Sequence, residues 1–329
     1  MKNFMNHVDN ILTESLDGFA AAHADILELG EEREFVRRKQ VKPGKVALIS
    51  GGGTGHEPLH AGFVGSGMLD AACPGQIFTS PTPNQMLSAA QAVDGGAGVL
   101  FIVKNYSGDM MNFQMAAEML DQDNETVIVN DDVAVENSTY TTGRRGVAGT
   151  LIVEKILGAA AERGDSLAQL KALGDAVNKA TASMGVALTS CTVPAAGKPT
   201  FQIGADEMEV GVGIHGEPGR RRVPLASADA IAAELTGAVM KDLSLRAGQE
   251  VILLVNGFGG TPMLELYLMV NAVHKLLAAA GVVAVRHLTG SYVTSLEMAG
   301  CSVTVTVADA ELLALWDAPV HTAALRWGM

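Results

Sequence analysis

Three side chains that can bind a polar ligand or move a proton lie close to predicted strand ends. His56 stands in "ISGGGTGHEPLH" (residues 49–60), shortly after an apolar run and three glycines. Lys104 ends a second apolar run, "GVLFIVK", and Asp109 follows at the start of a predicted helix. Imidazole, ammonium and carboxylate groups can each bind a polar ligand or take part in acid–base chemistry.

The glycine cluster at residues 51–53 has two interpretations. A strand followed by a glycine turn and a helix places backbone N–H groups around an anion. The cluster lacks the lysine of a P-loop and the third glycine of a dinucleotide-binding loop. A tight turn without any ligand is therefore an equally good explanation of the glycines.

A shared location favours a ligand site. Ser80, in "IFTSPTP", also lies at a junction between strand and helix. Ligands of open α/β sheets bind outside the carboxyl ends of the strands, so we expect Gly53, His56, Ser80, Lys104 and Asp109 to converge there. Asp109 could instead be a helix N-cap, and Lys104 a surface lysine, so the shared location shifts the balance only slightly.

His215 is the next candidate, in "EVGVGIHGEPG" (residues 209–219). Its flanking glycines would let another molecule approach the ring closely, although a histidine satisfied within a turn is the ordinary alternative. No pair of histidines has metal-ligand spacing, so we predict no protein-bound metal. The remaining histidines are assigned no role: His7, His23, His60, His274, His287 and His321.

The elements that must position these groups alternate along the chain. Strands are predicted at residues 45–50, 98–104, 126–130, 183–190, 209–214, 250–256, 282–288 and 302–307. Helices are predicted at 4–22, 83–93, 110–120, 147–162, 166–180, 226–241 and 261–280. The alternation predicts an α/β fold of two domains, each with a mostly parallel or mixed sheet flanked by helices. We place the domains at residues 1–185 and 186–329.

Composition excludes several classes of protein. A net charge of −13 disfavours binding to nucleic acid, which needs clustered basic residues. Three widely spaced cysteines, Cys73, Cys191 and Cys301, are interpreted as buried thiols in a reducing compartment. With no signal peptide and no apolar run long enough for a membrane span, we expect a soluble cytoplasmic protein.

Six motifs, in order, resemble the substrate-binding K subunit of the dihydroxyacetone kinases, over nearly the whole chain. They are "SGGGTGHEPLHAGFVGSGMLDAACPGQIFTSPTP", "VKNYSGDMMNF", "VNDDVAVENSTYTTGRRGVAGT", "CTVPAAGKP", "VGVGIHGEPG" and "LWDAPVHTAALRWGM". The resemblance implies phosphotransferase activity on dihydroxyacetone.

The resemblance also implies residue roles. His215 would bond reversibly to the ketone carbon and form a hemiaminal, which selects ketoses over glycerol. The substrate would be bound by Gly53, Lys104 and Asp109. We expect the same of Ser80, which lies at a neighbouring junction between strand and helix. Asp109 and His56 would handle the proton of the hydroxyl that attacks phosphorus, and the sequence leaves open which is the base.

We expect no nucleotide domain beyond "LRWGM". With that expectation, the resemblance implies a phosphoryl donor on a separate L subunit carrying ATP or ADP with Mg²⁺. A phosphotransferase-system M subunit and a homodimer are further family expectations. Two alternatives stay open. The chain could act on a four-carbon ketose such as erythrulose, or it could be a non-catalytic ketose-sensing co-regulator.

Overall fold

The computed structural model describes residues 3–134 and 141–329. Its contacts divide the chain into two compact units. The first unit comprises residues 1–128, 153–176 and 314–329, and the second comprises 129–152 and 177–313. The sequence prediction placed a single boundary between residues 185 and 186. The structure differs because the chain passes between the units four times, once within helix α4 (Gly149–Arg163).

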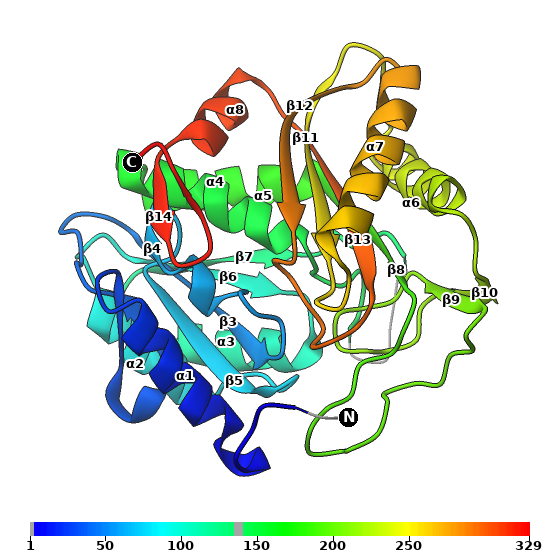
Figure 1. The fold of residues 1–329 in the computed structure, drawn as a ribbon. Coiled ribbons are helices and arrows are strands. Elements are labelled where there is room, and N and C mark those ends of the chain that lie inside the picture. The colour runs from blue at the N-terminus through cyan, green and yellow to red at the C-terminus, as the bar shows by residue number, and fades with distance from the viewer. Residues whose placement is uncertain (1–2, 135–140) are drawn as a thin grey trace. The chain divides into compact units, whose positions relative to one another are not determined.

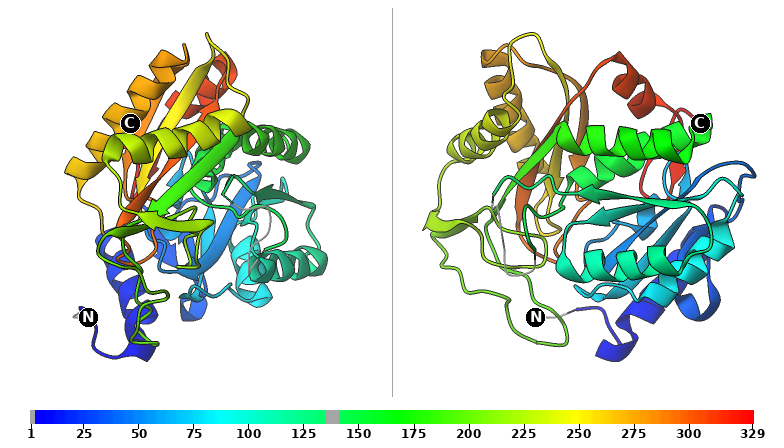
Figure 2. Two further views of the ribbon diagram at one scale, coloured as in Figure 1. Left: turned by 90° about the vertical axis from the view of Figure 1, so that its right-hand side faces the viewer. Right: turned by 180° about the vertical axis from the view of Figure 1, so that it is seen from behind.

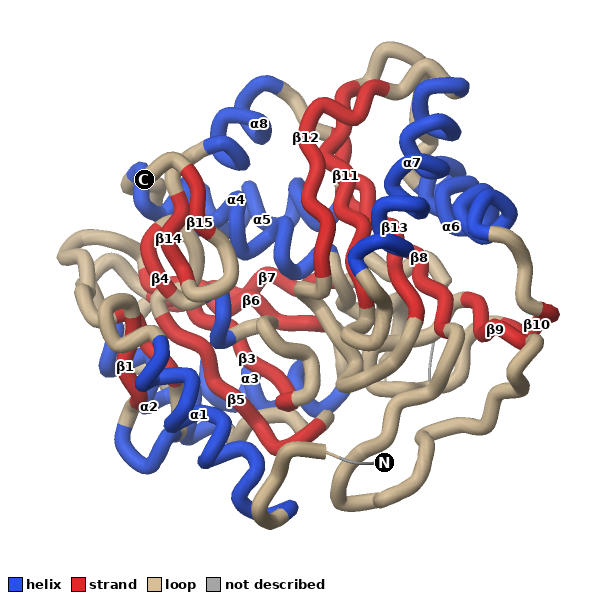
Figure 3. Tube along the Cα trace, viewed as in Figure 1, coloured by secondary structure: helices blue, strands red, loops and turns tan. Residues whose placement is uncertain are grey.

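A six-stranded sheet forms the centre of the first unit (Figures 1 and 3), in the order β1-β2-β5-β3-β6-β7. Its strands are β1 (Leu27–Leu29), β2 (Val36–Arg38), β3 (Ala47–Thr54), β5 (Ala71–Ile77), β6 (Val99–Lys104) and β7 (Asn124–Val129). Strand β3 runs parallel to both β5 and β6, so the carboxyl ends of these three strands meet at one edge. A small sheet joins β4 (Gly65–Ser66), β14 (Val320–Thr322) and β15 (Arg326–Trp327).

Helices cover both faces of this sheet, as Figure 2 shows. Helices α2 (Pro83–Val93) and α3 (Ser107–Met119) pack on one face, where their apolar side chains meet alternate residues of β3 such as Ala47 and Ile49. Helices α4 and α5 (Leu167–Lys179) cover the other face. The remaining helices of this unit are α1 (Ile11–Ala22) and α8 (Ala310–Asp317), the latter starting at its border. Because helices cover both faces of the sheet, side chains on both sides of each parallel strand are buried, and these strands are apolar along most of their length.

The second unit is built on a mixed sheet with the order β10-β9-β8-β13-β11-β12. Its strands are β8 (Thr181–Ala187), β9 (Glu207–Val210), β10 (Arg221–Pro224), β11 (Glu250–Gly257), β12 (Val283–Gly290) and β13 (Gly300–Val307). Within this sheet β11 and β12 are parallel, whereas β13, β8, β9 and β10 pair antiparallel with their neighbours. Helices α6 (Ala228–Asp242) and α7 (Met263–Ala279) lie side by side on one face and bury its valines and leucines.

The fold class is therefore the predicted one, two α/β units with mixed sheets flanked by helices. The three cysteines are free and buried, as predicted. No helix among the described residues combines the length and the apolarity needed to cross a membrane.

Candidate active site

The glycines of the first motif lie inside a strand, which corrects the predicted glycine turn followed by a helix. Strand β3 continues to Thr54, and Gly51, Gly52 and Gly53 face residues of β5 in the parallel ladder. A side chain at Gly52 would occupy the position of the Lys104 ammonium, and one at Gly53 would collide with the backbone after β5. Glycine is required here because neighbouring groups approach the strand closely.

Lys104 and Asp109 come together at the carboxyl edge of the sheet. Lys104 is the last residue of β6, and its side chain is fully buried. Asp109 lies in the first turn of α3 and is 4% exposed, with a carboxylate oxygen 3.6 Å from the Lys104 ammonium. Neither alternative applies, because Lys104 is not on the surface and Tyr106 occupies the cap position that Asp109 was expected to fill.

His56 and Ser80 lie on the loops of the same unit. The His56 ring is buried and stacks on Phe78, with ring centroids 5.1 Å apart and planes inclined by 22°. Ser80 is half-buried on the loop after β5. It lies close to α3, since a Cβ atom added at Gly108 would be 3.4 Å from the Cβ of Ser80. The first unit thus contains all five candidates predicted to converge: four lie on the loops and ends of β3, β5 and β6, and Asp109 lies in the first turn of α3.

His60, to which the sequence pattern assigned no role, is in contact with Lys104. Its Nε2 is 2.9 Å from the Lys104 Nζ, and its Nδ1 is 2.6 Å from Glu154 Oε1 and 2.9 Å from Ser50 Oγ. Burial and the Lys104 charge hold the pKa of His60 well below its usual value. Burial raises the pKa of the Glu154 carboxyl well above its usual value, against the opposing effect of Lys104. His60 is therefore a neutral imidazole at neutral pH.

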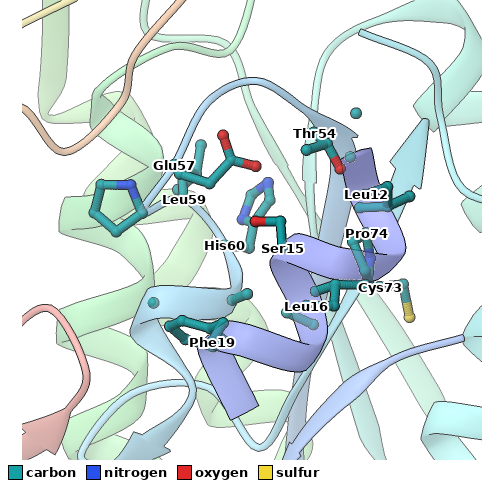
Figure 4. Close-up of a pocket in the computed structure, with 16 residues that line it drawn as sticks. Leu12, Ser15, Leu16, Phe19, Thr54, Glu57, Leu59, His60, Cys73 and Pro74 are labelled. Atoms are coloured by element: carbon teal, nitrogen blue, oxygen red, sulfur yellow. The ribbon is translucent and has the colours of Figure 1, made fainter. Parts of the chain in front are cut away.

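A cavity of about 340 Å³ opens beside this edge of the sheet, between α1 and the end of β3 (Figure 4). Of the five candidates predicted from the sequence, Gly53 is in the lining of this cavity. His60 and Glu57 also face the cavity. Leu12, Ser15, Leu16 and Phe19 of α1 form the opposite wall. A small polar molecule would find backbone, imidazole and carboxylate groups on one wall of this cavity and a largely apolar wall on the other.

His215 belongs to the second unit, on a loop that follows β9. The strand predicted for residues 209–214 ends at Val210, because Gly211 adopts a positive φ of 77°. The His215 backbone N–H donates to Glu217 Oε2 at 2.9 Å, and Glu217 Oε1 accepts from Arg145 at 3.2 Å. A second positive φ, of 69°, follows at Gly216. The loop around the half-buried imidazole is thus fixed by a buried carboxylate.

Arg145 is the centre of that loop's support. It is fully buried, with Nε 2.7 Å from Asp132 Oδ2 and Nη2 2.7 Å from the Gly211 carbonyl. Asp132 and Arg145 come from the third motif of the resemblance, of which residues 135–140 lie outside the described part of the chain. No group of three or more His, Cys, Asp or Glu side chains suited to a metal ion occurs among residues 3–134 and 141–329.

The residues that sequence reasoning missed had weak signals. Glu154 and Lys155 interrupt an otherwise apolar helical stretch, "TLIVEKIL", and a buried charge on such a helix needs a partner. Arg145 lies beside Arg144 in "GRRG", and only the fold shows that one is buried and the other exposed.

Comparison with known proteins places this geometry in a family. A family model described as the Dak1 domain matches residues 17–324. The chain belongs to the Dak1 domain family. This family assignment agrees with the resemblance drawn from the six motifs.

Proteins with named functions match over nearly the whole of this chain. The PTS-dependent dihydroxyacetone kinase 1, dihydroxyacetone-binding subunit DhaK, of Listeria innocua is 50% identical over 328 residues, which cover 98% of this chain and 100% of the relative. The dihydroxyacetone kinase of C. freundii, solved with AMP-PNP and Mg²⁺, superposes with a TM-score of 0.87 at 33% identity, covering 98% of this chain and 60% of that one. The dihydroxyacetone kinase operon co-activator Dha-DhaQ superposes with a TM-score of 0.90 at 34% identity, covering 94% and 97%.

Proposed function

We propose that this chain is the dihydroxyacetone-binding subunit of a dihydroxyacetone kinase, a phosphotransferase acting on an alcohol group. The observation that supports this most strongly is the buried Lys104–Asp109 pair, 3.6 Å apart, beside a strand end made of glycines. A triose offers hydroxyl groups to an ammonium, a carboxylate and backbone N–H groups. The full-length match to a relative named as such a subunit supports the same substrate.

His215 captures the ketone in this proposal. A ring nitrogen of the neutral imidazole donates its electron pair to the carbonyl carbon, forming a C–N bond. The π electrons of the C=O bond move to the oxygen, which takes up a proton, while the imidazole loses one. The product is a hemiaminal, and its formation selects a ketose because glycerol has no carbonyl group to react. The hydrogen bond from the His215 backbone to Glu217 supports this role by fixing the loop.

The terminal hydroxyl of the bound ketose would then attack the terminal phosphorus of ATP on a separate donor subunit. The bond from that phosphorus to ADP would break, and the hydroxyl proton would pass to Asp109 or His56. Gly53, Lys104 and Ser80 bind the remaining oxygens. Asp109 and His56 are both buried, so either group would act with little competition from water.

The phosphoryl donor in this proposal is a separate L subunit that binds ATP or ADP with Mg²⁺. The C. freundii kinase, solved in complex with AMP-PNP and Mg²⁺, supports a nucleotide donor in the family. The PTS-dependent relative supports rephosphorylation by a phosphotransferase-system M subunit. We also propose a homodimer that works in the cytoplasm.

Dihydroxyacetone labelled with carbon-13 at the carbonyl tests the capture step. In the NMR spectrum of the wild type, we expect the bound carbonyl signal to move to the region of a tetrahedral carbon. The His215→Ala variant should leave the carbonyl signal in place. An unmoved signal in both proteins would refute the covalent step, and four-carbon ketoses would then be tested in the same way.

Two alternative functions, a kinase subunit for a four-carbon ketose and a ketose-sensing co-regulator, predict different experimental results. A subunit specific for a four-carbon ketose would show the higher kcat/KM with erythrulose when assayed with an L subunit. A ketose-sensing co-regulator, which the likeness to the operon co-activator favours, would form the adduct without any turnover. The presence of His56 and Asp109 together supports catalysis, because a sensor needs only the group that forms the adduct.

A further inference from the structure

The position of the Lys104 ammonium is defined by three contacts of unequal strength. His60 Nε2 is the nearest partner, at 2.9 Å, while the Gly51 carbonyl lies at 3.4 Å and the Asp109 carboxylate at 3.6 Å. Because Gly52 has no side chain, the ammonium can fill the space beside its Cα. His60 therefore provides the one short hydrogen bond among these contacts.

The hydrogen-bond chemistry fixes the tautomer of His60. An ammonium group only donates, so Nε2 must accept from Lys104 and cannot hold a proton of its own. The ring proton is then on Nδ1, which donates to Glu154 Oε1 at 2.6 Å. Ser50 Oγ, 2.9 Å from the same Nδ1, donates its own hydrogen to the Ile102 carbonyl at 2.7 Å.

These groups come from separate elements and are all buried. Ser50 belongs to β3, Glu154 to α4 and Lys104 to β6, and each has an exposed fraction of 0%. His60, on the loop after β3, is 5% exposed. A buried polar chain of this kind is costly unless each member is paired, so its presence beside the candidate substrate lysine needs an explanation.

We propose that His60, held in one tautomer by Glu154 and Ser50, is a positioning residue that presents the Lys104 ammonium to the ketose. This inference rests on the proposed function. A lysine on its flexible four-carbon stem loses conformational freedom when it binds a ligand, and a hydrogen bond made beforehand removes part of that loss. The two longer contacts of the ammonium leave N–H donors that a substrate hydroxyl can use.

A matched pair of substitutions separates this role from simple packing. In His60→Gln the longer side chain can place an amide oxygen near the site of Nε2, where it accepts from Lys104. In His60→Asn the shorter amide can still donate to Glu154 but does not reach Lys104. Both variants remove the ring and are similar in polarity, so they differ chiefly in the contact that the proposal concerns.

Binding of dihydroxyacetone is measured by calorimetry, and KM and kcat are measured with the donor subunit added. We expect His60→Asn to weaken binding and raise KM by about tenfold or more, the effect of losing a hydrogen bond to a charged group. The kcat should change less, because the contact is made already in the bound ground state. His60→Gln should recover most of the affinity.

Equal affinities in His60→Asn, His60→Gln and the wild type would overturn the positioning role. Equal losses in the two variants would overturn it as well, because they would show that only the ring's packing matters. Failure of the proposed function gives a different result, namely no binding of dihydroxyacetone by the wild type itself.

Discussion

Each unit of the molecule contains a fully buried cation that hydrogen-bonds to a carbonyl oxygen. The two cations differ in how closely carboxylate groups approach them. In the second unit the Arg145 guanidinium contacts Asp132 and the Gly211 carbonyl, each at 2.7 Å, and Glu217 at 3.2 Å. In the first unit the shortest contact of Lys104 is a neutral imidazole nitrogen at 2.9 Å, and its nearest carboxylate oxygen is 3.6 Å away.

The difference indicates which cation is structural and which can serve a ligand. A planar guanidinium with several donors matched to carboxylates has little bonding capacity left, so Arg145 stabilises the loop that presents His215. A lysine whose carboxylate contact is long keeps donors available, and its charge is only partly balanced. On this comparison, substitution of Arg145 should chiefly lower the free energy of unfolding, and substitution of Lys104 should chiefly lower the affinity for the ligand.

The largest effect is expected for Arg145→Met, which would leave the Asp132 and Glu217 carboxylates buried without their cation. Loss of one partner from a buried ion pair costs about 3–5 kcal/mol, and we expect a fall of that size in the free energy of unfolding, measured by urea denaturation. Arg144→Met is the matched control, since its pair with Asp242 is partly exposed. It should cost about 0–1 kcal/mol, and equal losses in both variants would contradict the structural role of Arg145.

Lys104→Met should show the opposite pattern. The affinity for dihydroxyacetone should fall by about tenfold to a hundredfold, because hydrogen bonds to a charged group are lost. The free energy of unfolding should fall by less than in Arg145→Met. Calorimetric titration and urea denaturation of the same preparation measure both quantities, and a variant that loses stability while keeping its affinity would reverse the comparison.

Lys155 provides a third buried cation with which to sharpen the comparison. Its Nζ donates to the Leu315 carbonyl at 2.9 Å and lies 5.4 Å from the centre of the Trp327 ring. Burial lowers the pKa of Lys155 to about 8, although the Asp317 charge opposes the shift. The folded protein therefore releases this proton near pH 8, whereas the unfolded chain keeps it up to about pH 10.4.

Because the unfolded chain binds the extra proton between these pH values, the contribution of Lys155 to the free energy of unfolding rises with pH. Relative to Lys155→Met, the wild type should gain about 2–3 kcal/mol of stability between pH 7 and pH 10. Urea denaturation of both proteins at the two pH values measures this gain. A constant difference between them would show that Lys155 keeps its charge when buried.

Local patterns in the sequence predicted most of the framework. Apolar runs and helical periodicity located the central strands and the long helices, and α2 begins and ends at the predicted residues 83 and 93. Strand β5 escaped prediction because "AACPGQI" contains a proline and a glycine, which normally argue against a strand. The glycines of β3 were interpreted as a turn for the same reason.

Features that depend on distant contacts could not be predicted. Glu154 and His60 are 94 positions apart in the chain and meet only because α4 covers the face of the sheet beside that loop. Arg145 and Glu217 are separated by 72 positions. The candidate residues at the strand ends were predicted individually, whereas the buried groups that hold them needed the fold.

Calorimetric titration of the wild type with dihydroxyacetone, compared with glycerol, tests the central claim most directly. The two molecules share their terminal hydroxyl groups and differ at the central carbon, which only in the ketose can react with His215. Our account predicts saturable binding of dihydroxyacetone and none of glycerol at the same concentration. Equal affinities for the two molecules, or no binding of either, would contradict it.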